Sequence, residues 1–110
     1  MNKHAIIVAG GTGSRMLSDI PKQFISIAGK PILMHTIGKF FNFDHTISLI
    51  LVLPKDQFHY WKKLCNKFSF NIPHQLVEGG TSRFQSVKNG LTTINEKGMV
   101  AIHDLSLIHI

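Results

Sequence analysis

The chain has 110 residues, which is room for one domain, and 44% of them are hydrophobic, an ordinary share for a globular protein. The net charge of +6 fits a nucleic acid, an anionic lipid or a phosphorylated small molecule, but the basic residues are scattered, and this disfavours nucleic acid and membrane surfaces as partners. No stretch reaches the roughly 18 apolar residues of a membrane span, and the single cysteine favours a reducing compartment, so we expect a cytoplasmic protein.

A glycine-rich turn follows the first apolar run. Residues 5–8 are apolar at every position, which predicts a strand buried on both faces. Gly10, Gly11 and Gly13 then break the strand, and Arg15 and Lys22 follow within a short distance. Exposed backbone N–H groups beside two cations are the chemistry of a triphosphate site. The turn fits neither a P-loop nor a dinucleotide fingerprint, and by itself it is also compatible with a tight structural turn.

The middle of the chain alternates helical and strand patterns. Residues 16–30 hold no strong period, and Pro31 is suited to the first position of a helix over 31–42. A second buried strand covers 47–53, and Asp56 is positioned to cap the helix that follows. The predicted core face of that helix consists of Phe58, Trp61, Leu64, Cys65 and Phe68.

The last third of the chain continues this alternation. A short strand over 74–78 is followed by two glycines, and the hydroxyl of Thr81 or Ser82 can cap a helix over 83–95. A strand over 99–102 ends at His103 and Asp104. The predicted buried stripe of the 83–95 helix consists of Phe84, Val87, Leu91 and Ile94.

Strands that alternate with helices predict an α/β fold with a parallel sheet and right-handed crossovers. The polar or glycine-rich clusters at 10–15, 79–83 and 103–104 each follow a predicted strand. In open α/β sheets the carboxyl edge of the strands holds the ligand. We therefore expect these clusters to meet at one edge.

Five motifs, in this order and spacing, resemble the cytidylyltransferases related to sugar nucleotidyltransferases, and most closely the 2-C-methyl-D-erythritol 4-phosphate cytidylyltransferase family. The resemblance implies a Rossmann-like, three-layer α/β/α fold with a mainly parallel sheet, of the nucleotide-diphospho-sugar transferase type and truncated. The motifs are Val8-Ala-Gly-Gly-Thr-Gly-Ser-Arg-Met16, Pro21-Lys-Gln-Phe24, Gly29-Lys-Pro-Ile-Leu-Met-His-Thr36, Glu78-Gly-Gly-Thr-Ser-Arg-Phe-Gln-Ser-Val87 and Ile102-His-Asp104.

The resemblance also implies a role for each matching residue in the transfer of CMP from CTP to a sugar-alcohol phosphate, with release of pyrophosphate. Arg15 and Lys22 would be catalytic, holding the triphosphate and the transition state, and Asp104 would bind Mg²⁺. Thr81 stands where some members carry an acidic residue. The residues that would contact CTP are Ala9, Gly10, Gly11 and Gly13 around the triphosphate, and Gly80, Thr81, Arg83 and Ser86 at the cytosine and ribose.

Two alternatives stay open beside this reading. Ribitol-5-phosphate cytidylyltransferases share the loop and the lysine motif, and a non-catalytic nucleotide-binding module could keep the fold. Arg15, Lys22 and Asp104 together argue against the non-catalytic module.

The resemblance covers about half of the family's domain. It assigns residues 1–104 to the N-terminal, CTP-binding half, without the acceptor-binding residues and the arm through which full-length members form homodimers. Residues 105–110 do not resemble the family, and we expect them to come from a frame error or read-through. We expect such a chain to be marginally stable or to aggregate, and not to turn over.

Overall fold

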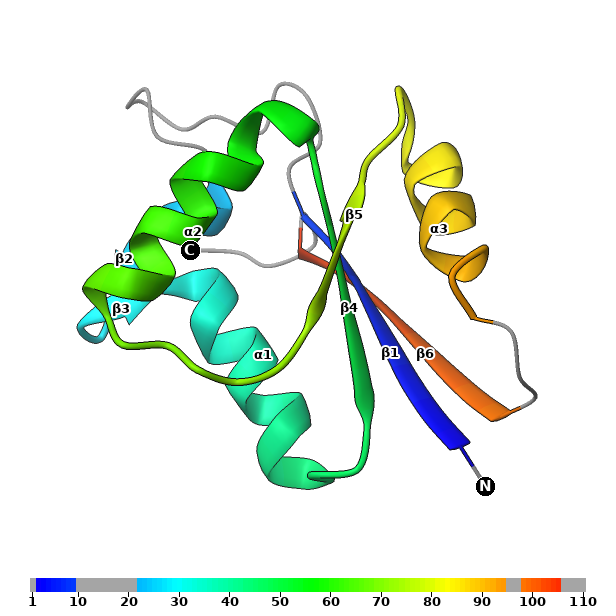
Figure 1. Ribbon diagram of the computed structural model, residues 1–110, viewed down its shortest axis with the longest axis horizontal. Coiled ribbons are helices and arrows are strands. Elements are labelled where there is room, and N and C mark those ends of the chain that lie inside the picture. Colours follow the sequence, from blue (N-terminus) through cyan, green and yellow to red (C-terminus); the bar gives the residue numbers. More distant parts are fainter. Residues whose placement is uncertain (1, 10–21, 95–97, 106–110) are drawn as a thin grey trace.

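The computed structural model of the protein describes residues 2–9, 22–94 and 98–105. Its centre is a four-stranded parallel sheet in the order β5-β4-β1-β6 (Figure 1). This confirms the predicted α/β fold with a mainly parallel sheet. The strands are β1 (Asn2–Val8), β4 (Ser48–Leu53), β5 (Gln75–Glu78) and β6 (Gly98–Asp104), and the helices are α1 (Ile32–Phe43), α2 (Phe58–Lys67) and α3 (Arg83–Leu91).

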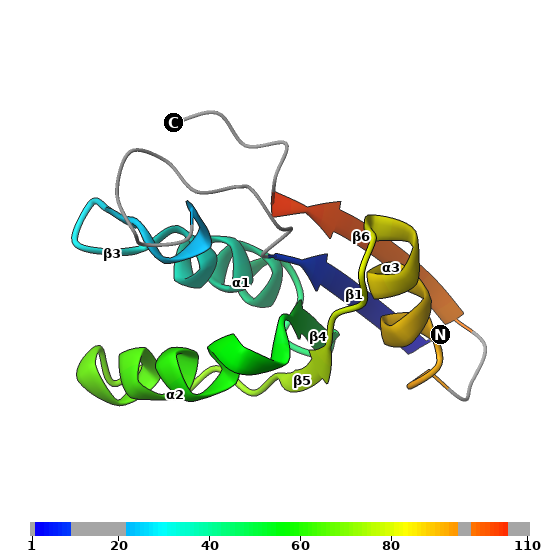
Figure 2. The ribbon, with the colours of Figure 1, turned by 90° about the horizontal axis from the view of Figure 1, so that it is seen from above.

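Helices cover both faces of the sheet, which gives the three layers that the sequence predicts (Figure 2). Helices α1 and α2 lie on one face and α3 on the other. Side chains alternate along β1, so that Ile7 is buried beneath α1 and α2 while Ile6 is buried beneath α3. The same alternation in β4 explains why both strands read as continuous apolar runs.

Two short 3₁₀ turns and a small hairpin complete the described chain. The turns are η1 (Lys22–Phe24) and η2 (Lys55–Gln57), and the hairpin pairs β2 (Ser26–Ile27) with β3 (Lys30–Pro31). The hairpin turn needs positive φ at both Ala28 and Gly29, with values of 52° and 89°. The sequence did not predict this hairpin, because two-residue strands are too short to show a period.

Two predicted helix starts are wrong in detail. Pro31 ends β3 and precedes α1 instead of opening the helix. Asp56 does not cap α2, because the turn η2 lies between β4 and the helix, and Gln57 occupies the N-cap position without a side-chain cap bond.

The predicted buried face of α3 is also partly wrong. Phe84 is 76% exposed and Leu91 is 41% exposed, whereas Ser86 and Gly90 face the sheet. A Cβ on Gly90 would lie 2.9 Å from Cγ2 of Ile6, so the missing side chain lets α3 approach the sheet closely. The helix is also shorter than predicted, since it ends at Leu91.

Within the described ranges, no helix combines the length and the apolar character that crossing a membrane requires.

Candidate functional site

The carboxyl edge of the sheet brings Ala9 together with two of the segments that the sequence singled out, 79–83 and 103–104. The backbone N–H of Ala9 donates to the carbonyl of Val52 at 3.0 Å, and that of Gly79 donates to Leu53 at 2.7 Å. Asp104 is the register partner of Val8, directly before Ala9. The 79–83 and 103–104 clusters therefore lie at the same edge as Ala9, where the topology predicted a ligand site. The third predicted cluster, 10–15, lies outside the described residues.

Part of the predicted site lies outside the described residues. Gly10, Gly11, Gly13 and Arg15 are in the undescribed range 10–21. Lys22 is described by its backbone, as the first residue of η1. The roles assigned to these residues by resemblance stay predictions.

The segment 79–86 forms a tight connection from β5 to α3. The hydroxyl of Ser82 accepts the backbone N–H of Gln85 at 3.1 Å, so of the two predicted caps it is Ser82 that caps the helix. The backbone N–H of Gly80 donates to Oγ of Ser86 at 3.0 Å, and Ser86 is 8% exposed. A Cβ on Gly80 would lie 2.1 Å from Cγ of Gln85, so a side chain at position 80 would force Gln85 to move. The segment is therefore a turn held by its own hydrogen bonds, with Gln85 packed against Gly80.

Arg83 and Asp104 form an ion pair between Nε and Oδ2 across this edge. The Asp104 side chain is 12% exposed and the Arg83 side chain 62%. A cation in the first turn of a helix is placed unfavourably against the helix dipole, and the carboxylate offsets this. Thr81, two residues before Arg83 in the chain, is exposed.

The carboxylate of Asp104 fits a magnesium ion that is also bound by the phosphates of a nucleotide. Mg²⁺ in nucleotide sites is typically bound by one or two carboxylates together with phosphate oxygens. Asp104 supplies one such carboxylate at the sheet edge, although Oδ2 is engaged by Arg83. Among the described residues, no group of three or more His, Cys, Asp or Glu side chains is placed to hold a metal alone. The arrangement thus suits a metal that arrives with phosphates.

The sequence did not predict a contact near this edge between two glutamine side chains, Gln23 and Gln57. Gln23 lies in the Pro-Lys-Gln-Phe motif, and its amide contacts the amide of Gln57 at 2.6 Å. Gln57 stands in no motif, and no periodicity marks it, so only the three-dimensional contact could have identified it.

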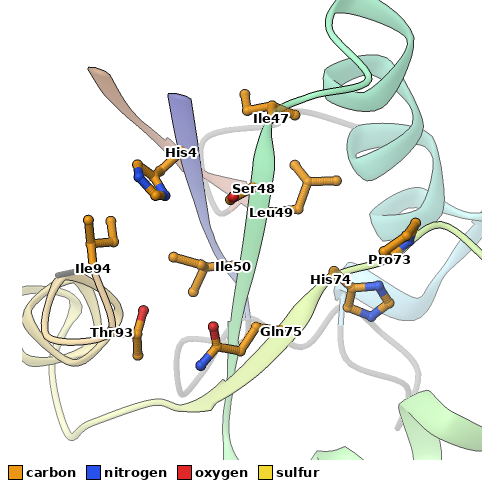
Figure 3. Close-up of a pocket in the computed structure, with 10 residues that line it drawn as sticks. All are labelled: His4, Ile47, Ser48, Leu49, Ile50, Pro73, His74, Gln75, Thr93 and Ile94. Atoms are coloured by element: carbon orange, nitrogen blue, oxygen red, sulfur yellow. The ribbon is translucent and has the colours of Figure 1, made fainter. Parts of the chain in front are cut away.

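A hollow of about 490 Å³ lies at the other end of the sheet, near the amino ends of β4 and β5 (Figure 3). Its described lining mixes apolar and polar side chains, and none of these residues is Lys, Arg, Asp or Glu. The lining residues are His4, Ile47, Ser48, Leu49, Ile50, Pro73, His74, Gln75, Thr93 and Ile94.

Comparison with known proteins gives one consistent answer. The family model described as IspD, 2-C-methyl-D-erythritol 4-phosphate cytidylyltransferase, matches residues 3–107. Enzymes of that name from Phocaeicola vulgatus and Bacteroides thetaiotaomicron are 53% and 49% identical to the chain over 104 residues, which is 94% of this chain and 48% of each relative. The chain thus spans about half the length of the curated relatives it matches.

Solved structures agree with the sequence relatives. The crystal structure of 4-diphosphocytidyl-2C-methyl-D-erythritol synthase from Anaerococcus prevotii matches with a TM-score of 0.71 at 28% identity, over 94% of this chain and 42% of that one. A second synthase structure matches with a TM-score of 0.66 at 23% identity and supports the fold alone.

Proposed function

The chain belongs to the 2-C-methyl-D-erythritol 4-phosphate cytidylyltransferase family, and from this premise we propose that it forms the CTP-binding side of such an enzyme. The complete enzyme would transfer CMP from CTP to 2-C-methyl-D-erythritol 4-phosphate and release pyrophosphate, in the non-mevalonate route to isoprenoid precursors. The observation that carries the proposal is the meeting of Ala9, the 79–86 turn and Asp104 at one sheet edge. The single cysteine fits a reducing compartment, and we place the enzyme in the cytoplasm.

The proposed reaction is an in-line displacement at phosphorus. A phosphate oxygen of the acceptor attacks the α-phosphorus of CTP, a new P–O bond forms, and the bond to the leaving pyrophosphate breaks. Negative charge grows on the equatorial and leaving oxygens. Fixed cations stabilise this charge more than they stabilise the ground state, which is the role we assign to Arg15 and Lys22. An arginine presents a planar fork to two oxygens, and a lysine presents a point charge.

The 79–86 turn would bind the nucleoside part of CTP. Gly80 lets the Gln85 side chain pack closely against the turn, because a Cβ at position 80 would collide with it. Ser86 fixes the turn by accepting the Gly80 N–H. Thr81 and Arg83 are exposed in this turn, and the Arg83 guanidinium is paired with Asp104.

Asp104 would hold Mg²⁺ together with the phosphates of CTP. The ion would neutralise part of the phosphate charge. Arg83, which is paired with Oδ2 of Asp104, would contact the nucleotide at the same edge.

Calorimetric titration of the 110-residue chain with CTP tests the binding half of the proposal. We expect binding of CTP with Mg²⁺, weaker binding of ATP, and a loss of CTP affinity in Arg15→Ala. A chain that binds neither nucleotide would contradict the assignment of this half to CTP.

A hybrid protein tests the reaction. Residues 1–104 are joined to the C-terminal half of the Phocaeicola vulgatus relative, and pyrophosphate release is followed with methylerythritol phosphate and ribitol 5-phosphate in parallel. We expect release with the first acceptor and none from the 110-residue chain alone. Release only with ribitol 5-phosphate would transfer the proposal to that enzyme class, and no release with either would overturn the catalytic reading.

A further inference from the structure

We propose that Gln57 is a positioning residue for Lys22, acting through Gln23 and the 3₁₀ turn η1. This inference rests on the proposed function, because it assumes that Lys22 contacts the triphosphate. It adds a residue that lies outside every motif of the family resemblance.

The first contact is aromatic and fixes the last residue of η1. Phe24 is 4% exposed and belongs to the core between the sheet and helices α1 and α2. Its ring stacks on Trp61 with 6.2 Å between centroids, and it meets the edge of Tyr60 at 5.0 Å. Both partners lie in the first half of α2. The turn is therefore packed against the helix that follows β4.

The second contact is polar and fixes the residue between Lys22 and Phe24. The side chain of Gln23 is 2% exposed, and its Nε2 donates to Oε1 of Gln57 at 2.6 Å. A buried amide needs hydrogen-bond partners, because an unpaired polar group in the interior carries a large desolvation penalty. Gln57 supplies such a partner.

Gln57 is itself held at the carboxyl edge of the sheet. It ends η2, and its backbone N–H donates to the carbonyl of Pro54 at 2.9 Å, one residue beyond the end of β4. Further along the chain, the N–H of Ile32 donates to the carbonyl of Ile25 at 3.0 Å and ties the exit of η1 to α1. The three residues that follow Lys22 are thus each held by a contact with another part of the fold.

A lysine is a flexible cation on a four-carbon stem, so the position of its charge depends on where its backbone is held. Electrostatic stabilisation of a triphosphate needs that charge in place before the ligand arrives. The packing of Phe24 holds η1 against α2. The hydrogen bond between Gln23 and Gln57 is suited to fix the orientation of the turn about its own axis. Loss of the pair should therefore weaken the interaction between Lys22 and the triphosphate, while the nucleoside contacts remain.

The test compares CTP with CMP, which lacks the β- and γ-phosphates. Gln57→Met keeps the volume of the side chain and removes the amide. We expect the CTP affinity of the 110-residue chain to fall about three- to tenfold, the effect of one buried hydrogen bond, and the CMP affinity to stay the same. Gln75→Met is the matched control, because Gln75 is an exposed glutamine at the opposite edge of the sheet. Gln57→Asn, which keeps an amide but shortens its reach, is the second variant.

A double-mutant cycle with Lys22→Ala separates positioning from a general loss of structure. In the Lys22→Ala background, Gln57→Met should have no further effect on CTP affinity. Thermal unfolding of every variant is recorded, and binding is measured where all of them are folded. An equal loss of CTP affinity with and without Lys22, or an unchanged preference for CTP over CMP, would overturn the proposal. Absence of CTP binding in the parent chain would overturn the proposed function and this inference together.

Discussion

The guanidinium of Arg83 is paired with the carboxylate of Asp104, so the first residue of α3 is joined to the last residue of β6. The register explains the pair, because Asp104 aligns with Val8, whose side chain lies on the face that α3 covers. The family resemblance gives these two residues separate roles, one at the nucleoside and one at the metal. A cation held by Asp104 would therefore compete with Arg83 for one carboxylate oxygen.

Asp104→Asn is expected to remove the dependence of CTP binding on magnesium. The amide keeps the shape of the side chain but loses the charge that a hard cation prefers. The Mg²⁺-dependent gain in CTP affinity should fall at least about tenfold, since changing residues that only orient a metal ligand already costs 10- to 100-fold. Titration with and without Mg²⁺ measures this, with the exposed Asp56→Asn as control. A variant whose CTP binding still strengthens with Mg²⁺ would rule out Asp104 as the ligand.

The sheet could be predicted from sequence because its signal is local. Residues 49–53 are apolar at every position, because alternate side chains pack against helices on opposite faces of the sheet. The position of the 79–83 and 103–104 segments at the carboxyl edge was also predictable, because parallel strands place all their carboxyl ends together.

The features that escaped prediction depend on contacts between distant residues. The buried face of α3 could not be found from hydrophobicity, because the helix approaches the sheet through Ser86 and Gly90 and leaves Phe84 outside. Gln23 and Gln57 are both polar and far apart in the chain. The sequence around each residue gives no sign that their side chains form a hydrogen bond.

Ser86→Ala is expected to destabilise the turn between β5 and α3. The substitution leaves the N–H of Gly80 without its hydroxyl acceptor, and a polar group deprived of its partner costs about 1–3 kcal/mol. We expect the free energy of unfolding to fall by about that amount in urea titrations and the affinity for CTP to fall with it. The exposed Ser26→Ala is the matched control. Unchanged stability and unchanged CTP affinity would show that the bond does not hold the turn.

Asp44 is expected to make the stability of the protein depend on pH in the acid range. Lys3, whose Nζ lies 2.7 Å from Oδ2, and Thr46, which donates from its hydroxyl and backbone, hold the pKa of Asp44 well below its usual range. Since the folded-state pKa is lowered, this stabilisation is fully present above the unfolded-state pKa of about 4 and is lost as the pH falls toward the folded-state value. Urea titrations of the parent and Asp44→Asn should therefore differ most above pH ~5 and converge below pH ~4. A difference that stays constant through this range would exclude a contribution from ionisation.

The edge strand β6 is expected to make the 110-residue chain self-associate. β6 is at one edge of the sheet, it has seven residues, and its only charged side chain is Asp104 at the end. Met99 is 60% exposed and Ile102 is 52% exposed, and an apolar edge with free backbone groups is a template for pairing with another chain. Ile102→Lys should shift the molar mass in light scattering toward the monomer, because a charge on an edge strand opposes pairing. Ile27→Lys places the same charge on an apolar residue that is 41% exposed in the β2–β3 hairpin, and it should leave the association unchanged. A parent chain that is monomeric at every concentration and unfolds in one cooperative transition would contradict this expectation.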